Sequence, residues 1–360
     1  MYILTLNTFS VAKKINYYII LCFIISAGCM HESEDFVENA IDYGSELNAS
    51  TIKLNEGLSV LQPGAMVNVN DTHLLISDVE EEEVFKVFRL PDLEYLYSWG
   101  KKGRGPDEFQ FVPVTIVNTE SNAVNFYDIS RKTLRYYSLS DTAFVGLGEK
   151  SFSYEGQQNV FTDITMVTDS LFIADYGNQE TNDDFEFIGL KPSSETPLFK
   201  VGDYPSEDLT GFERHFADFK TSVSSPDGKK FGYFYLYHNL LKFIDLETKE
   251  VREVIINDDD LNDKQIEQGV FQYRTVKWAS NDYLYVLGLN ENRDVISEKL
   301  DEFITSLEIW TWDGDMVFRA KFDRPIHDFT VSEKAGKIIA YSQLNSSELY
   351  QYDLPDIINE

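Results

Sequence analysis

The most distinctive side-chain chemistry lies in the stretch WGKKGRGPDEF, residues 99–109. Residues 100–105 hold three cations and three glycines, in a chain whose formal net charge is -30. Glycine-rich loops and nearby cations can bind phosphate, but nucleotide-binding loops need a following helix whose N-terminus meets the phosphates. Here the strand-like segment DEFQFVPVTIV follows. We therefore exclude a nucleotide-binding loop and expect a turn that leads into another strand.

Two interpretations of this stretch remain. Lys101, Lys102 and Arg104, together with Arg131 from a later turn, could attract an anionic ligand. Alternatively, the glycines form a tight turn, Arg104 pairs with an aspartate, and Phe109 fills the space between two sheets. Glycine–proline strings more often shape the backbone than bind ligands, so the turn-forming interpretation is the expected one.

Other patterns that would indicate catalysis are weak. The sequence contains neither Gly-x-Ser-x-Gly nor His-Glu-x-x-His, and none of its five histidines stands at metal-binding spacing to another. Residues 257–269, NDDDLNDKQIEQG, match a calcium loop at Asp258, Asp260 and Asn262 but lack its turn glycine and final glutamate. We expect no catalytic residue and no cofactor, with calcium as the one candidate metal.

The overall composition also limits the class of partner. The chain has 61 acidic and 31 basic residues, and such a surface repels the phosphates of nucleic acid. Its 360 residues can bury a substantial core. Aromatic residues make up 14% of the chain, which favours strands because flat rings pack well on a pleated surface.

The first 28 residues differ in kind from the rest. Lys13 and Lys14 precede the apolar run INYYIILCFIISAG, which is too short to span a bilayer. The run ends in ISAGC (25–29), which resembles a bacterial lipoprotein signal, in which Cys29 is lipidated and becomes the first mature residue. The only other cysteine, Cys22, lies in the removed segment, so the mature chain has no disulfide. An uncleaved anchor or an ordinary signal peptide is the alternative.

The residues after Cys29 indicate a location. MHESEDF (30–36) is acidic and resembles the export signal of surface lipoproteins in Bacteroides-type bacteria. We therefore expect residues 29–49 to form a polar tether, and the lipid to hold the protein on the outer membrane, facing the cell surface of a Gram-negative bacterium.

From residue 50 onwards, short alternating segments separated by turn residues form repeated units of four strands. The sixth unit has only three strands, whereas STIKLNE (50–56) belongs to no unit; an N-terminal strand of this kind can complete the last blade of a ring. We predict an all-β, six-bladed β-propeller over residues 50–360, with seven blades or a sandwich as alternatives because the unit lengths differ. The expected units are 64–99, 112–148, 161–202, about 215–256, 272–322 and 327–354.

Two segments resemble a known family. SSPDGKKFGY (224–233) is similar to the Ser-Pro-Asp-Gly-Lys turn of TolB-type propeller repeats, where Asp-Gly forms a tight hairpin. LQPGAMVNVNDTHLLISD (61–78) and the glycine-rich stretch resemble TolB-like six-bladed propeller lipoproteins of Bacteroides-type bacteria, although Asp107 stands where that string commonly has glycine. The resemblance implies the fold and the lipid anchor; many members have no assigned activity, so it implies little about chemistry.

The predicted topology also gives a candidate ligand-binding rim. In a propeller, the loops between blades and the loops after each second strand share one face, and that face commonly carries ligands. Asp78, Asp128 and Asp175 would end second strands there. The basic residues Lys101, Lys102, Arg104 and Arg131 would join them, with Arg214, His215, Arg274, His327 and Asp328 near the starts of units four to six.

These observations favour a binding or interaction module with a protein or glycan partner. The alternatives are a lactonase- or lyase-like hydrolase with a metal over the pore, and a purely structural envelope protein. Asp141-Thr142-Ala143 and Asp169-Ser170-Leu171 resemble O-glycosylation sites of exported Bacteroides-type proteins, so Thr142 and Ser170 are candidate acceptors.

Overall fold

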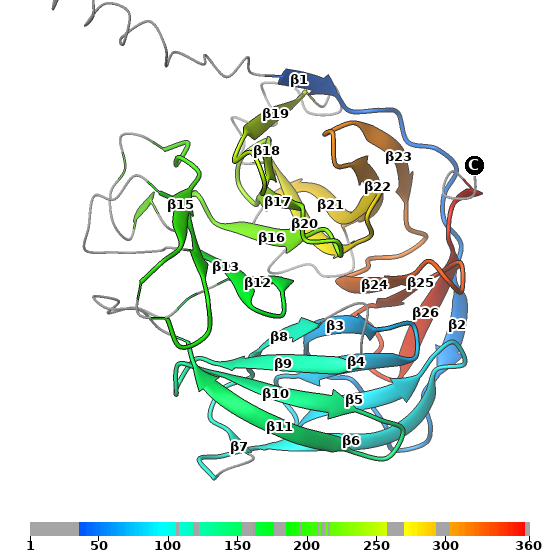
Figure 1. Cartoon of the computed structure of the whole chain (residues 1–360). Coiled ribbons are helices and arrows are strands. Elements are labelled where there is room, and N and C mark those ends of the chain that lie inside the picture. The colour runs from blue at the N-terminus through cyan, green and yellow to red at the C-terminus, as the bar shows by residue number, and fades with distance from the viewer. Residues whose placement is uncertain are drawn as a thin grey trace, which may run out of the picture. The chain divides into compact units, whose positions relative to one another are not determined.

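Short strands and tight turns build six sheets, in which most neighbouring strands are antiparallel, arranged around a common centre (Figure 1). The computed structural model describes residues 36–105, 108–117, 122–152, 161, 163–175, 185–194, 196–206, 209, 213–214, 217–257, 270–292 and 303–356. Apart from two N-terminal strands, each added at the outer edge of a later sheet, the strands of a sheet follow one another in chain order, as expected when neighbours are joined by short hairpins.

Blades one to three hold the first half of the ring. Blade one contains β3 (Pro63–Val69), β4 (His73–Asp78), β5 (Glu83–Arg89), β6 (Glu94–Lys102) and β7 (Glu108–Phe109). Blade two contains β8 (Val114–Val117), β9 (Ala123–Asp128), β10 (Thr133–Leu139) and β11 (Phe144–Ser151). Blade three contains β12 (Ile164–Thr168), β13 (Leu171–Asp175), β14 (Phe187–Leu190) and β15 (Phe199–Val201).

Blades four to six hold the second half together with the N-terminal strands. Blade four contains β16 (Lys220–Ser224), β17 (Lys230–Tyr235), β18 (Leu240–Asp245), β19 (Val251–Asn257) and β1 (Phe36–Asn39). Blade five contains β20 (Val270–Ala279), β21 (Tyr283–Asn292), β22 (Ser306–Thr311) and β23 (Met316–Lys321). Blade six contains β24 (Asp328–Ser332), β25 (Lys337–Tyr341), β26 (Glu348–Asp353) and β2 (Ser50–Lys53).

The ring closes as the sequence predicts. The innermost strands touch in the order β3, β8, β12, β16, β20 and β24, and β24 touches β3 again. Strand β2 pairs antiparallel with β26, from Ser50 opposite Gln351 to Lys53 opposite Glu348, and so supplies the strand that the sixth unit lacks. Both the six-bladed architecture and its closure by an N-terminal strand are therefore confirmed.

The core follows the same ring. Six hydrophobic clusters occur in the described residues, and each one joins two adjacent blades. The cluster between blades six and one, for example, contains Ile339 and Leu349 beside Leu74 and Phe88. Burial of apolar surface contributes roughly 25 cal/mol per Å². Because each blade buries both its faces against neighbouring blades, this contribution stabilises the ring as a whole.

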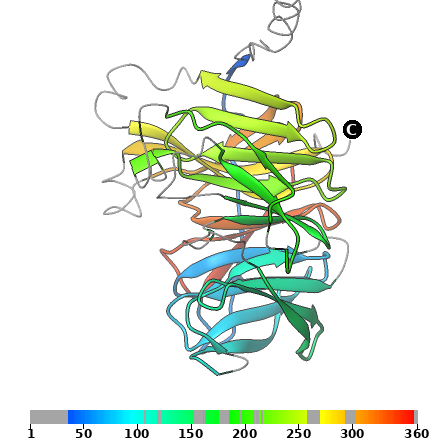
Figure 2. The same cartoon turned by 60° about the vertical axis from the view of Figure 1, so that its left-hand side comes forward.

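The N-terminal segment departs from the expectation of a tether. Strand β1 pairs in parallel with β19, so that it adds a fifth strand to blade four (Figure 2). The amide of Gly44 then donates to the carbonyl of Arg319 at 2.8 Å, and Leu47 donates to Lys321 at 2.8 Å. Residues 36–49, predicted as tether, thus lie along the outer strands of blades four and five, because open sheet edges offer backbone groups that any extended segment can pair with.

The turn in residues 224–233 forms as its sequence predicts. Gly228 has a φ of +70°, and its amide donates to the carbonyl of Ser225 at 2.9 Å. A Cβ at this position would lie 2.8 Å from the carbonyl oxygen of Val167 in blade three. Gly228 is therefore required both by the backbone conformation and by the close approach of the neighbouring blade.

Candidate ligand-binding rim and channel

The glycine-rich stretch forms a compact turn that ends on blade one. Strand β7 pairs in parallel with β6, and the amide of Gly103 donates to the carbonyl of Phe109 at 3.0 Å. The carboxylate of Glu108 folds back and accepts a hydrogen bond from the amide of Gly105 at 2.7 Å. A Cβ on Gly103 would lie 2.0 Å from that carboxylate oxygen, so a larger residue there would displace Glu108 from its hydrogen bond to Gly105.

Phe109 joins blades one and two. Its side chain is fully buried, and its ring centroid lies 5.8 Å from those of Phe85 and Trp99 and 5.7 Å from that of Phe126. The guanidinium of Arg135 lies 4.8 Å from the same ring. Burial of a phenylalanine contributes about 2 kcal/mol, and the surrounding aromatic contacts add to it. The turn therefore positions an anchor for the interface between the two blades.

The basic residues of this stretch are divided between backbone contacts and solvent. Arg131 donates from Nη2 to the carbonyl oxygens of Gly105 and Arg104, at 2.6 and 3.2 Å. Lys102 donates from Nζ to the carbonyl of Val79 at 2.5 Å. Lys101 and Arg104 have exposed side chains. Two of the four predicted anion contacts, Lys102 and Arg131, thus bond to backbone carbonyls and connect neighbouring loops of the rim.

Acidic residues stand next to these cations. Residues 80–83 are four consecutive glutamates. Glu83 lies opposite Lys101 in the β5–β6 pair, and the amide of Lys102 donates to the carbonyl of Glu82 at 3.1 Å. Opposite charges this close together largely cancel each other's electrostatic field. Salt screens what remains of that field beyond about 10 Å. The rim of blade one is therefore of mixed charge, which weakens the anion-binding interpretation.

The three aspartates at the ends of second strands are buried parts of ion pairs. Asp78 is fully buried and accepts a hydrogen bond from Nζ of Lys86 at 2.8 Å. Burial by itself raises the pKa of Asp78. The hydrogen bonds from Lys86 and from the amide of Leu61 outweigh burial and hold this pKa below its ordinary value. Asp128 lies 3.8 Å from Nη1 of Arg135.

The aspartate of blade three follows a variation of this pattern. Asp175 is buried and lies 3.9 Å from Nζ of Lys220, which comes from the inner strand of blade four. All three aspartates therefore lie on the predicted face of the ring but beneath its surface, where each one orients a cation between strands.

Arg214, Arg274 and Asp328 are also engaged by the fold. Arg274 is buried and binds Glu308 through Nε and Nη2, at 2.8 and 3.1 Å. Arg214 donates from Nε to the carbonyl of Leu209 at 2.6 Å, and Asp328 lies 2.8 Å from Nζ of Lys277.

Of the two predicted rim histidines, only His327 falls within the structure as described. Its ring centroid lies 5.2 Å from that of Phe303, and burial lowers its pKa to about 4. It is therefore neutral at physiological pH. His215 lies outside the described residues, as does Cys29.

A buried polar cluster between blades three and four was not predicted from the sequence. Glu186 is fully buried and accepts hydrogen bonds from the hydroxyls of Tyr233, at 3.0 Å, and Tyr235. Lys220 and Lys242 approach the same carboxylate at 3.3 and 3.7 Å.

One sequence pattern could have predicted this cluster: a basic residue recurs in the third strands of several units. The third strands of three units carry one cation between apolar or aromatic neighbours: Lys86 in VFKVF, Arg135 in TLRYY and Lys242 in LLKFI. In blades one and two this cation stands opposite the residue two positions before the terminal aspartate, since Lys86 pairs with Ile76 and Arg135 with Phe126.

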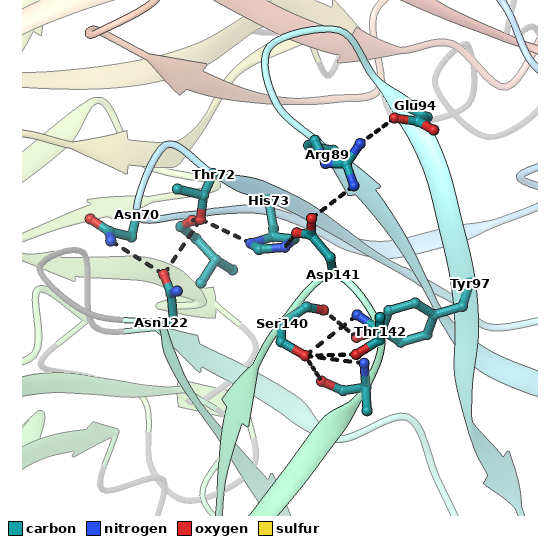
Figure 3. A network of polar contacts seen from close by, with 12 residues as sticks. Asn70, Thr72, His73, Arg89, Glu94, Tyr97, Asn122, Ser140, Asp141 and Thr142 are labelled. Atoms are coloured by element: carbon teal, nitrogen blue, oxygen red, sulfur yellow. Dashed lines mark hydrogen bonds and ion pairs between the residues drawn. The ribbon is translucent and has the colours of Figure 1, made fainter.

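Figure 3 shows a polar network on the opposite face of the ring, where the hairpins of blades one and two meet. Asp141 accepts a hydrogen bond from Arg89 at 2.7 Å, and its other oxygen lies 2.9 Å from Nε2 of the buried His73. The hydroxyl of Ser140 caps the next turn, which leaves Thr142 exposed. Ser170 is exposed at another hairpin, so both candidate acceptors are accessible; their modification stays a prediction.

The described residues contain no group of three or more His, Cys, Asp or Glu side chains that could hold a metal. The calcium-like segment falls almost wholly outside them, because only Asn257 of residues 257–269 is described. Within the same ranges no helix has the length and apolar character needed to cross a bilayer.

The inner strands of all six blades surround a central channel with a volume of about 450 Å³. Side chains on these strands connect neighbouring blades across its wall. Thr165 and Ser222 form a hydroxyl–hydroxyl hydrogen bond of 2.9 Å between blades three and four, and the backbone N–H of Asn68 donates to the hydroxyl of Thr330 at 3.2 Å between blades one and six.

A closed ring of six sheets around such a channel, joined by one strand from the N-terminus, defines a six-bladed β-propeller. The family model for TolB-like 6-blade propeller-like proteins matches residues 42–334, and the chain belongs to this family. The family resemblance proposed from the sequence is therefore confirmed.

Two solved structures from Bacteroides are similar to this chain. A candidate exported protein of Bacteroides fragilis has 13% sequence identity and a TM-score of 0.55, and the match covers 89% of this chain and 99% of that one. A member of the DUF4221 family from Bacteroides vulgatus has 10% identity and a TM-score of 0.60, with 86% and 97% covered. At such identities the likeness shows the fold alone. A search of curated proteins finds no match.

Proposed function

We propose that this chain is an outer-membrane lipoprotein, attached by a lipid at Cys29 and exposed at the cell surface, whose propeller is a binding module for a protein or glycan partner. The signal-like residues 1–28 and the acidic residues after Cys29 support the location. Similarity in fold to a candidate exported protein of Bacteroides fragilis agrees with passage out of the cytoplasm.

The observation that carries the binding role is the position of the exposed apolar side chains. Nine large apolar residues are exposed among those described. Six of the nine lie in loops of one face, the rim formed by blade connections and by loops after second strands; they are Leu61, Val79, Phe111, Tyr237, Ile304 and Leu344. Exposed apolar residues that gather on one face commonly mark an interaction surface.

Three of the six lie close together on blade one. The amide of Val79 donates to the carbonyl of Gln62, next to Leu61, at 2.8 Å. Val79 and Val112 both approach the backbone of Gly64, where an added Cβ would lie 3.3 and 3.5 Å from their methyl groups. Phe111, which precedes Val112 in the same loop, is 60% exposed. An aromatic anchor beside smaller apolar groups and a mixed-charge border suits a partner surface.

Labelling with radioactive palmitate tests the anchor. The wild-type protein expressed in a Bacteroides host should incorporate the label, and Cys29→Ser should abolish incorporation because the thiol is the acylated group. Cys22→Ser is the matched control and should keep the label, since this cysteine lies in the removed segment. Equal labelling of both variants, or an unlabelled full-length chain, would contradict the proposal.

Photo-cross-linking in cells tests the binding face. A photoreactive amino acid at Phe111 or Tyr237 should give discrete cross-linked products. The same group at Leu198, which is 50% exposed but lies before β15 on the opposite face, should not give them. Identical products from all three positions, or none from the rim, would count against a rim-mediated partner.

A further inference from the structure

The central channel has the dimensions and the wall of a ligand pocket. Its volume of about 450 Å³ lies within the range of roughly 300–1,000 Å³ that is usual for small-molecule sites. Hydroxyl-bearing residues are frequent along it. Those that line it are Thr115, Thr165, Thr168, Ser222, Ser224, Ser225 and Thr330.

The charged groups of the channel are mainly acidic. Asp163, Asp169 and Asp227 line it together with a single cation, Lys277. That cation lies 2.8 Å from Asp328, which is not part of the lining, so its charge is already offset. A narrow space lined by carboxylates concentrates positive charge, because its low-dielectric walls focus the field.

Asp163 is the carboxylate best placed to recognise a ligand. It stands one residue before β12 and accepts a hydrogen bond from the hydroxyl of Ser222, which is in turn 2.9 Å from the hydroxyl of Thr165. Among charged neighbours, Asp175 and Lys220 face it from blades three and four. Burial, assisted by the charge of Asp175, raises the pKa of Asp163 to about 6.

An apolar surface completes the wall. Met66, Met166 and Trp278 line the same channel. An indole ring also attracts cations and covers the apolar faces of sugars.

We propose that the channel is a binding site for a small hydroxylated organic cation, of which a protonated amino sugar is the simplest example. Its ammonium group pairs with Asp163, and its hydroxyl groups bond with Ser222 and Thr165. A neutral sugar of the same size lacks the ammonium, and an anion is repelled by the carboxylates. This site is separate from the rim, and the proposal does not depend on the rim-mediated partner.

Isothermal titration calorimetry of the mature chain tests the proposal at pH 7.5, with glucosamine as the probe and glucose as its neutral counterpart. We expect glucosamine to bind at least tenfold more tightly than glucose. Asp163→Asn should abolish that preference, because it removes the charge with little change in shape. Asp313→Asn is the matched control, since Asp313 is exposed outside the channel, and should leave binding unchanged.

The pH dependence gives a second, independent measurement. Below the pKa of Asp163, each unit of pH should weaken glucosamine binding up to about tenfold, because the carboxyl must lose its proton to pair with the ammonium. Asp163→Asn should show no such dependence; Ser222→Ala, which keeps the carboxylate, should show it. Circular dichroism confirms that each variant is folded. Equal affinity for glucosamine and glucose, or wild-type preference in Asp163→Asn, would overturn the proposal.

Discussion

At the scale of single residues, charged side chains mainly hold blades together. Asp78, Asp128 and Asp175 were predicted as ligand contacts on the rim, and the structure places all three below its surface in ion pairs. The sequence indicates their location correctly because each one ends a second strand. It does not indicate their burial, because an aspartate at a strand end looks the same whether its partner is a ligand or a lysine of the next strand.

His327 allows a test of residue-scale electrostatics through pH. Burial lowers its pKa from 6.5 to about 4, so the folded state binds its proton more weakly than the unfolded state. Its contribution to stability is therefore present above pH 6.5 and is lost as the pH falls from 6.5 towards 4. Allowing for the partial exposure of the ring, the loss should be about 1–2 kcal/mol.

Urea unfolding of His327→Asn at pH 7.5 and pH 4.5 measures this contribution. Asparagine can still accept the hydrogen bond that Nδ1 accepts from the amide of Gln343, but it does not titrate. The variant should therefore lose less stability than the wild type between the two pH values. If both lose the same amount, protonation of His327 does not contribute to acid unfolding.

At the scale of elements, the sequence predicted strands well where side chains alternate. The expected first unit, 64–99, differs from the span of β3 to β6, 63–102, by at most three residues at either end. Strand positions are predictable here because each strand packs both faces against neighbouring blades, so a strand such as β4 is a short, wholly buried run bounded by turn residues.

The N-terminal segment shows where such prediction fails. Residues 36–49 lack regular alternation, and they pair with blades four and five through backbone groups and the ring of Tyr43, which lies 4.0 Å from the guanidinium of Arg319. Backbone pairing leaves no pattern in side chains. The cluster around Glu186 was missed for a related reason, since lysine, glutamate and tyrosine normally indicate a solvated surface.

At the scale of the whole molecule, ring closure makes stability depend on a few N-terminal residues. Strand β2 is remote in sequence from β26, and without it blade six would expose the backbone edge of β26 to solvent. By contrast, β1 adds a fifth strand to a blade that already has four. The two strands should therefore differ in importance, although both are short and N-terminal.

Two N-terminal truncations separate these roles. A chain that begins at residue 48 retains β2, and it should unfold in one transition with a midpoint lower by only a few degrees, because it loses peripheral pairing of roughly 1–2 kcal/mol. A chain that begins at residue 55 lacks β2, and its open edge should make it aggregate or unfold well below the longer one. Differential scanning calorimetry and size-exclusion chromatography measure both effects. Equal stability of the two chains would show that β2 does not close the ring energetically, even though it completes the sixth sheet.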